Sequence, residues 1–300
     1  MLKEDLLKED ESSSGLYFSF LVIFVITLSV IFSAFALSKG AVEELSTKTW
    51  YVFTSFALSP LAIIAFTLVF TYFKGESIIK TCGWQKTELK YYVIALMAFI
   101  SVFFGLGNLN TAFVDFLSKK FGYTANAITL PAFSVTNYLL VILTVCILPA
   151  IAEEVAMRGI LLRGIKTNGV LLKATIGGLL FSLYHMSPMQ TPYQFAVGFV
   201  FSLIAIKSSS TLPTTVAHFL NNFAIVTIEY FCPTLLASKG GFTTVITVVA
   251  TACLGMVIAL LLIDKNCKEK LEKGSLKNFF LYASFGIFIC LAMWLSGFLR

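Results

Sequence analysis

The sequence is poor in charge and almost without histidine. Only 13% of its 300 residues are Asp, Glu, Lys or Arg, whereas a soluble domain carries about a quarter. Hydrophobic residues make up 58% of the chain, and the mean hydropathy is +0.88. This composition argues against a soluble globular domain and predicts an all-α, polytopic membrane protein.

We predict a single membrane domain over residues 1–300, with eight or nine transmembrane helices. The segment at 193–206 is short and is expected to be tilted or re-entrant, which leaves the count open by one. The mixed apolar and basic segment at 111–121 predicts a loop helix or an interfacial helix. The candidate spans lie at about 16–37, 51–73, 91–107, 136–157, 172–188, 193–206, 211–231, 241–263 and 278–299.

The two sides of the predicted bundle differ in basic residues. With nine spans, 16 of the 22 Lys and Arg residues fall in the N-terminal segment and after the even-numbered spans, counting Lys173 with the connection before it. The positive-inside rule then predicts a cytoplasmic N-terminus, and a prokaryotic source would place the chain in the plasma membrane. Membrane orientation accounts for the distribution of the basic residues. The lipid bilayer is therefore an expected partner, and nucleic acid is not.

The N-terminal segment MLKEDLLKEDESSSG lacks the positive region of a secretory signal. We therefore expect the first apolar segment to be retained as a helix. Cysteine gives no sign of a disulfide framework, because no CxxC pair or zinc-finger spacing occurs. The six cysteines are Cys82, Cys146, Cys232, Cys253, Cys267 and Cys290.

An adjacent carboxylate pair, Glu153 and Glu154, lies in the apolar segment CILPAIAEEVAMRGILLR. Pro149 removes a backbone donor one turn earlier, so a bend is expected there. Glu154 and Arg158 are four residues apart and can form an ion pair, while Glu153 points about 100° away from Glu154. We expect a cation to hold Glu154 while Glu153 faces a cavity; the alternative is a solvated helix end.

The only two histidines, His185 and His218, also lie in apolar segments. Phe181 shares a helix face with His185, and Asn222 shares one with His218, whereas Asn221 points elsewhere. A single intramembrane histidine is often a packed, hydrogen-bonded residue. Two histidines, an amide and a carboxylate pair together indicate a buried functional site.

Glu153, His185 and His218 are predicted to lie at one depth in the membrane. Each is ten to twelve residues from a Lys or Arg that marks the cytoplasmic end of its helix. At 1.5 Å per residue these offsets are roughly 15–18 Å. Three separate helices can therefore bring these side chains to one site, and we expect residues 145–225 to form a catalytic core.

These residues resemble the three signature motifs of the CAAX-protease and bacteriocin-processing family of intramembrane proteases (CPBP, or Abi). The family patterns are Glu-Glu-x-x-x-Arg, Phe-x-x-x-His and His-x-x-x-Asn or Asp. The matching residues are Glu153, Glu154 and Arg158, then Phe181 and His185, then His218 and Asn222. The resemblance implies an intramembrane endopeptidase, a hydrolase that acts on membrane peptides or protein tails.

The resemblance also implies a role for each residue. Glu153 would be the general base that activates water. Glu154 and Arg158 would form an orienting pair, and His185 would position the water. His218 and Asn222 would stabilise the oxyanion of the intermediate.

A metal ion is the open question at this stage. Zinc or another divalent metal would need three protein ligands, which His185, His218 and Glu153 could supply. The HExxH pattern of zinc proteases is absent. We favour metal-independent chemistry with Glu153 as the base.

Two other functions fit an apolar chain with buried ionisable residues. The first is a non-catalytic immunity or scaffolding protein that binds a peptide or membrane partner, and the intact motifs argue against it. The second is a proton- or ion-coupled transporter. Such transporters usually contain inverted repeats, and we see none in this sequence.

Overall fold

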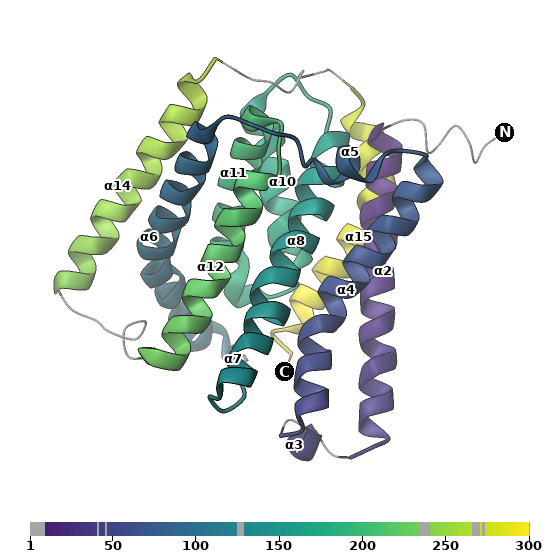
Figure 1. Cartoon of the computed structure of the whole chain (residues 1–300), viewed down its shortest axis with the longest axis vertical. Coiled ribbons are helices and arrows are strands. Elements are labelled where there is room, and N and C mark those ends of the chain that lie inside the picture. Colours follow the sequence, from purple (N-terminus) through teal and green to yellow (C-terminus); the bar gives the residue numbers. More distant parts are fainter. Residues whose placement is uncertain are drawn as a thin grey trace.

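The regular elements of this chain are helices. The computed structural model describes residues 10–40, 42–45, 47–124, 129–233, 241–265, 271 and 274–299. Within these ranges no β-strand occurs (Figure 1), which confirms the predicted all-α class.

Nine helical stretches correspond one-to-one to the nine predicted spans. One of them is composite: α7 (Val135–Val141), η1 (Ile142–Ile147), α8 (Leu148–Glu154), η2 (Val155–Leu161) and α9 (Leu162–Gly164) follow one another without a break. The other eight are α2 (Asp10–Leu37), α4 (Thr49–Lys74), α6 (Leu89–Phe121), α10 (Val170–Tyr184), α11 (Thr191–Ser208), α12 (Leu212–Phe231), α14 (Gly241–Ile263) and α15 (Leu276–Ser296). The short elements are α3 (Val42–Leu45), α5 (Ile78–Cys82) and η3 (Pro188–Gln190).

Seven of these stretches are long and apolar enough to cross a membrane. The remaining two are α10, with 15 residues, and α12, which carries a histidine and two asparagines. The predicted count of eight or nine is therefore roughly correct. The segment 193–206 is not short, because η3 and α11 together cover residues 188–208.

The prediction for residues 111–121 was wrong. This segment is neither a separate loop helix nor a separate interfacial helix, because α6 runs through it without interruption for 33 residues. Lys119 and Lys120 lie in the last turn of α6, and Gly122 ends the helix with a left-handed backbone (φ 65°). Basic residues are favourable at a helix C-terminus, which explains why the helix continues this far.

The motif-bearing helices occupy the middle of the bundle. Figure 1 shows α8, α10, α11 and α12 in the centre, α6 with α14 on one side, and α2 with α4 and α15 on the other. The pairs α10–α11, α2–α15 and α6–α14 pack directly against each other. The flanking helices therefore cover two sides of the central four.

The connections that the charge pattern predicts on one side do meet at one end of the bundle. This end carries α5 and lies at the top of Figure 1. Three hydrogen bonds join the connections: Thr211 N to Gly83 O at 3.0 Å, Lys207 Nζ to Asp264 O at 2.6 Å, and Arg163 Nη1 to Lys80 O. Their assignment to the cytoplasm stays a prediction.

The described cysteines are free thiols, as the sequence predicts. They are Cys82, Cys146, Cys232, Cys253 and Cys290. Cys267 lies outside the described residues.

Candidate active site

The carboxylate pair lies where the composite helix changes its geometry. Glu153 and Glu154 end α8, which is α-helical, whereas η1 before it and η2 after it are π-helical. Such π-helical turns occur frequently at functional sites. Pro149 is the second residue of α8, so the helix is irregular where the missing backbone donor predicts it to be.

Glu154 is fully buried and bonded to two motif residues. Its Oε1 accepts from Arg158 Nη1 at 2.7 Å and from His218 Nδ1 at 3.1 Å. The predicted ion pair between Glu154 and Arg158 is therefore present, and neither side chain reaches solvent. Glu154 also joins α8 to α12, a connection that the sequence did not reveal.

Arg158 is enclosed by the second motif and by α11. Its guanidinium carbon lies 4.2 Å from the centre of the Phe181 ring and 5.8 Å from that of Phe201. Arg158 Nη2 donates to the carbonyl of Gly198 at 3.5 Å. The cation is thus held by a carboxylate on one side and by aromatic faces on the others.

Phe181 organises the site more extensively than its motif position suggests. Its ring lies edge-on to the imidazole of His185, with centroids 4.8 Å apart, and edge-on to that of His218 at 6.1 Å. Its backbone carbonyl accepts from His185 Nδ1 at 2.8 Å. One residue therefore contacts three other motif residues and fixes the orientation of His185.

His185 lies just beyond the end of a helix rather than within one. The sequence predicts a span to residue 188, but α10 ends at Tyr184. Met186 adopts a left-handed backbone (φ 49°), and Pro188 disfavours a helical conformation in the residue before it. The imidazole of His185 bonds to the last turn of α10, as basic side chains commonly do at a helix C-terminus.

The Nδ1 contacts determine what the two imidazoles present to the site. A backbone carbonyl only accepts hydrogen bonds, so His185 Nδ1 carries the hydrogen toward Phe181. The carboxylate of Glu154 also only accepts, so His218 Nδ1 carries a hydrogen too. In their neutral forms both rings therefore present an acceptor at Nε2.

Both Nε2 atoms lie near one oxygen of Glu153. Glu153 Oε2 is 3.9 Å from His185 Nε2 and 3.9 Å from His218 Nε2. It is buried and has no hydrogen-bond partner among the described residues. Three acceptors thus converge when both rings are neutral. A water molecule can donate to two of them, and a proton on one imidazole turns that acceptor into a donor.

The converging atoms are of the kinds that bind divalent metals. A carboxylate and two imidazoles, each oriented by an acceptor behind it, have the chemistry of a divalent-metal site. A tetrahedral zinc ion would hold its ligand atoms about 3.3 Å apart, and the two measured separations are 3.9 Å. In the part of the chain that the structure describes, no group of three His, Cys, Asp or Glu side chains is placed to hold an ion. As placed, Glu153 Oε2 is therefore farther from the two Nε2 atoms than neighbouring ligands of one zinc ion are from each other.

Asn222 lies one turn beyond His218, but its partners differ from those of the other motif residues. Its Nδ2 donates to the carbonyl of Val145 at 3.1 Å, and its Oδ1 accepts from Asn221 at 3.3 Å. Asn221 in turn accepts from Tyr193 OH at 2.6 Å. Sequence reasoning set Asn221 aside and did not single out Tyr193, because no motif marks them.

Small residues allow α10 and α11 to approach closely enough to form the site. A Cβ atom at Gly198 would lie 2.9 Å from Gly178 Cα and 3.0 Å from Phe181 Cδ1. A Cβ atom at Gly178 would lie 2.8 Å from Phe199 N. The crossing therefore depends on glycine on both helices, as in other close helix pairs in membranes.

A family model matches the central segment of the chain. Residues 135–224 match the family model described as type II CAAX prenyl endopeptidase Rce1-like. The matched residues run from α7 into α12 and include all three motifs. The match confirms the resemblance that the motifs predict and supports a CAAX-type membrane endopeptidase in general. No curated protein and no solved structure shows significant similarity to this chain.

Proposed function

Because residues 135–224 match the Rce1-like CAAX endopeptidases, we propose that this chain is an intramembrane endopeptidase. Its substrates would be membrane-associated peptides or protein tails. One observation supports this proposal more than any other: a buried, unpartnered carboxylate oxygen of Glu153 faces the Nε2 atoms of His185 and His218.

The first step is activation of water. A water molecule beside Glu153 donates one hydrogen to Glu153 Oε2 and the other to His185 Nε2, which leaves a lone pair for attack on the peptide carbonyl. Glu153 takes up the proton as the water oxygen bonds to the carbonyl carbon. A positioned general base of this kind contributes about 10²- to 10⁴-fold to a rate.

The charge of the cluster assigns a separate role to His218. Glu153, Glu154 and Arg158 together carry a net charge of −1, and one imidazolium would bring the site to zero. Uncompensated buried charge is costly, and His218 is the imidazole that bonds to a carboxylate. We assign the extra proton to His218, whose Nε2–H then stabilises the oxyanion of the tetrahedral intermediate.

The second step breaks the peptide bond. The tetrahedral intermediate collapses, the carbon–nitrogen bond breaks, and Glu153 returns its proton to the leaving amine. The products are a carboxylic acid and an amine, the acid then loses its proton to solvent or to the amine, and the site is restored to its starting protonation. Glu154 and Arg158 change no bonds in this scheme; they hold His218 in place.

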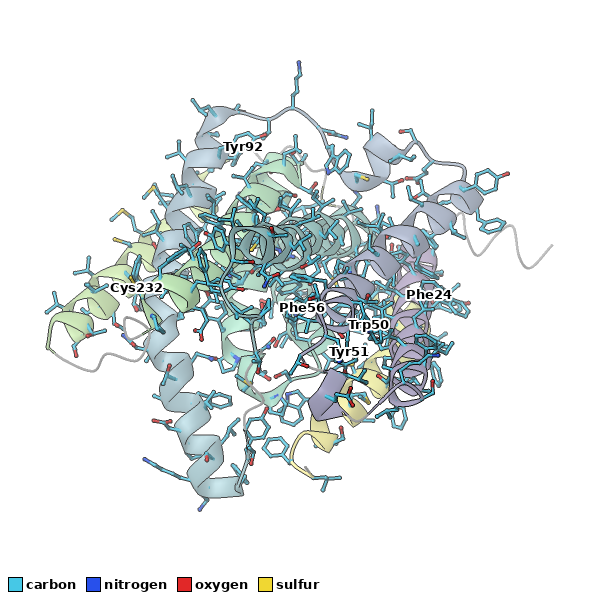
Figure 2. The ribbon with its side chains drawn as sticks, turned by 60° about the horizontal axis from the view of Figure 1, so that its bottom comes forward. Phe24, Trp50, Tyr51, Phe56, Tyr92 and Cys232 are labelled. Atoms are coloured by element: carbon cyan, nitrogen blue, oxygen red, sulfur yellow. The ribbon has the colours of Figure 1, made fainter. Side chains whose placement is uncertain are left out.

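An open apolar groove next to the composite helix supports access from the membrane. Its volume is about 660 Å³, and it lies among α2, α4, α7 and η1. Figure 2 shows Phe24 on α2 and Trp50 on α4, two of the residues that line it. Leu140 and Thr144 line its other side, two to three turns before Glu153. An apolar substrate segment fits such a lining.

The proposal is tested by cleavage of lipid-anchored and unmodified membrane peptides by the full-length protein in vesicles. Glu153→Gln and His185→Ala should each lower turnover by about 10²-fold or more while leaving thermal unfolding close to that of the wild type. The matched control is Glu229→Gln, an exposed carboxylate on α12, which should cleave normally.

Wild-type turnover in Glu153→Gln would contradict the proposal. The non-catalytic binding function would be favoured if a Glu153→Gln protein cleaves nothing but still restores normal behaviour to cells that lack the wild-type protein.

A further inference from the structure

Three hydrogen bonds connect α11 to the composite helix through the asparagine pair of α12. Tyr193 OH donates to Asn221 Oδ1 at 2.6 Å, Asn221 Nδ2 donates to Asn222 Oδ1 at 3.3 Å, and Asn222 Nδ2 donates to Val145 O at 3.1 Å. The series ends on a backbone carbonyl of η1, eight residues before Glu153.

The acceptor at the end of the series determines which group donates in each hydrogen bond. The carbonyl of Val145 can only accept, so Asn222 must turn its NH₂ group toward it and its oxygen toward Asn221. Asn221 then offers its own NH₂ group to Asn222 and its oxygen to the hydroxyl of Tyr193. Each group has one arrangement, so the series fixes the Asn222 side chain.

The carbonyl of Val145 is the one that Pro149 deprives of its helical partner. In an α-helix the carbonyl of residue 145 accepts from the N–H of residue 149, and proline has none. Asn222 supplies a side-chain N–H to this carbonyl instead. The third motif thus compensates for the proline in the segment that carries the first motif.

We infer that Tyr193, Asn221 and Asn222 are positioning residues that hold the composite helix at Pro149 and so set the direction of Glu153. The inference deepens the proposed function, on which its catalytic consequence rests. It adds to the oxyanion role that the resemblance implies, because Asn222 Nδ2 carries two hydrogens and the Val145 carbonyl takes only one of them. It also gives functional roles to Tyr193 and Asn221, which lie outside the motifs.

A double-mutant cycle between Asn222 and Pro149 tests this inference. Pro149→Ala restores an N–H at residue 149, which can bond to Val145 O, so the loss of Asn222 should then matter less. In the wild-type background, Asn222→Ala should lower kcat roughly five- to tenfold, with KM unchanged, as expected for one lost buried hydrogen bond. In the Pro149→Ala background the decrease should be clearly smaller.

Thermal unfolding supplies a readout that does not depend on catalysis. Asn222→Ala should lower the unfolding temperature by roughly 2–4 °C in the wild-type background and by clearly less in the Pro149→Ala background. Equal decreases in both backgrounds, in kcat and in unfolding temperature, would overturn the inference. Because the unfolding cycle needs no substrate, it holds even if Glu153→Gln disproves the proposed function.

Tyr193→Phe is a second variant in case Pro149→Ala does not fold. It removes only the hydroxyl that holds Asn221, so it should lower kcat severalfold without changing KM. Wild-type kcat in Tyr193→Phe would overturn the roles of Tyr193 and Asn221. Tyr92→Phe, on α6 and outside the hydrogen-bond series, is the matched control (Figure 2).

Discussion

The guanidinium of Arg158 lies 4.2 Å from the centre of the Phe181 ring, which brings the first and second motifs into direct contact. The same cation bonds to Glu154, and Glu154 bonds to His218 of the third motif. All three motifs are therefore joined through one buried ion pair. Removing one member should affect the whole site.

We expect Arg158→Ala to destabilise the protein strongly. It leaves Glu154 buried without its cation, and breaking a buried pair in this way costs about 3–5 kcal/mol. Arg158→Lys keeps the charge but loses the planar group that reaches both Glu154 and Gly198, so its effect should be smaller. Thermal unfolding in detergent measures both variants, and an Arg158→Ala protein as stable as the wild type would contradict the assigned pairing.

The α10–α11 crossing should tolerate no side chain at Gly198. A methyl group there would lie closer to Gly178 and Phe181 than van der Waals contact allows. Overpacking of this kind costs about 1–3 kcal/mol. We expect Gly198→Ala to lower the unfolding temperature and the rate of cleavage, because it displaces Phe181, which contacts both histidines.

Gly255→Ala on α14 is the matched control for this substitution. A Cβ atom there would meet nothing within 4 Å, so the variant should unfold and cleave like the wild type. Equal behaviour of Gly198→Ala and Gly255→Ala would show that the close crossing is unimportant.

The sequence predicts that the site residues come together, but it does not predict the hydrogen bonds that connect them. The offsets of Glu153, His185 and His218 from basic helix ends predict that they lie at one depth, and the structure places each Nε2 atom 3.9 Å from Glu153 Oε2. The ion pair of Glu154 with Arg158 follows from their spacing on one helix. Such features depend on helix geometry alone, which the sequence specifies.

Contacts between helices could not be predicted in the same way. The bond from His218 to Glu154 and that from Asn222 to Val145 depend on how α12 lies against the composite helix. The π-helical turns depend on local packing, for which no simple residue pattern exists. The early end of α10 agrees with Pro188, a signal that the predicted span to residue 188 did not take into account. These contacts set the hydrogen positions and hence the roles of the two imidazoles.

The predicted orientation can be checked by labelling single cysteines in cells. Lys86 lies in the connection between α5 and α6, and Thr47 lies between α3 and α4, near the opposite ends of α4. With the six native cysteines replaced, a membrane-impermeant maleimide added outside should label Thr47→Cys and spare Lys86→Cys until the membrane is permeabilised. The reverse pattern would invert the topology, and labelling of both from outside would refute it.

Metal dependence is the remaining test of the proposed chemistry. Glu153, His185 and His218 are more widely spaced than ligands around one zinc ion, and the proposed mechanism uses Glu153 alone as the base. We expect the purified protein to cleave at an undiminished rate after prolonged treatment with a strong chelator. Elemental analysis of the same samples should find less than one metal ion per chain before treatment. Loss of activity together with a stoichiometric metal, restored when zinc is returned, would replace the carboxylate-base scheme with a metal-bound one, because both imidazoles then serve as ligands.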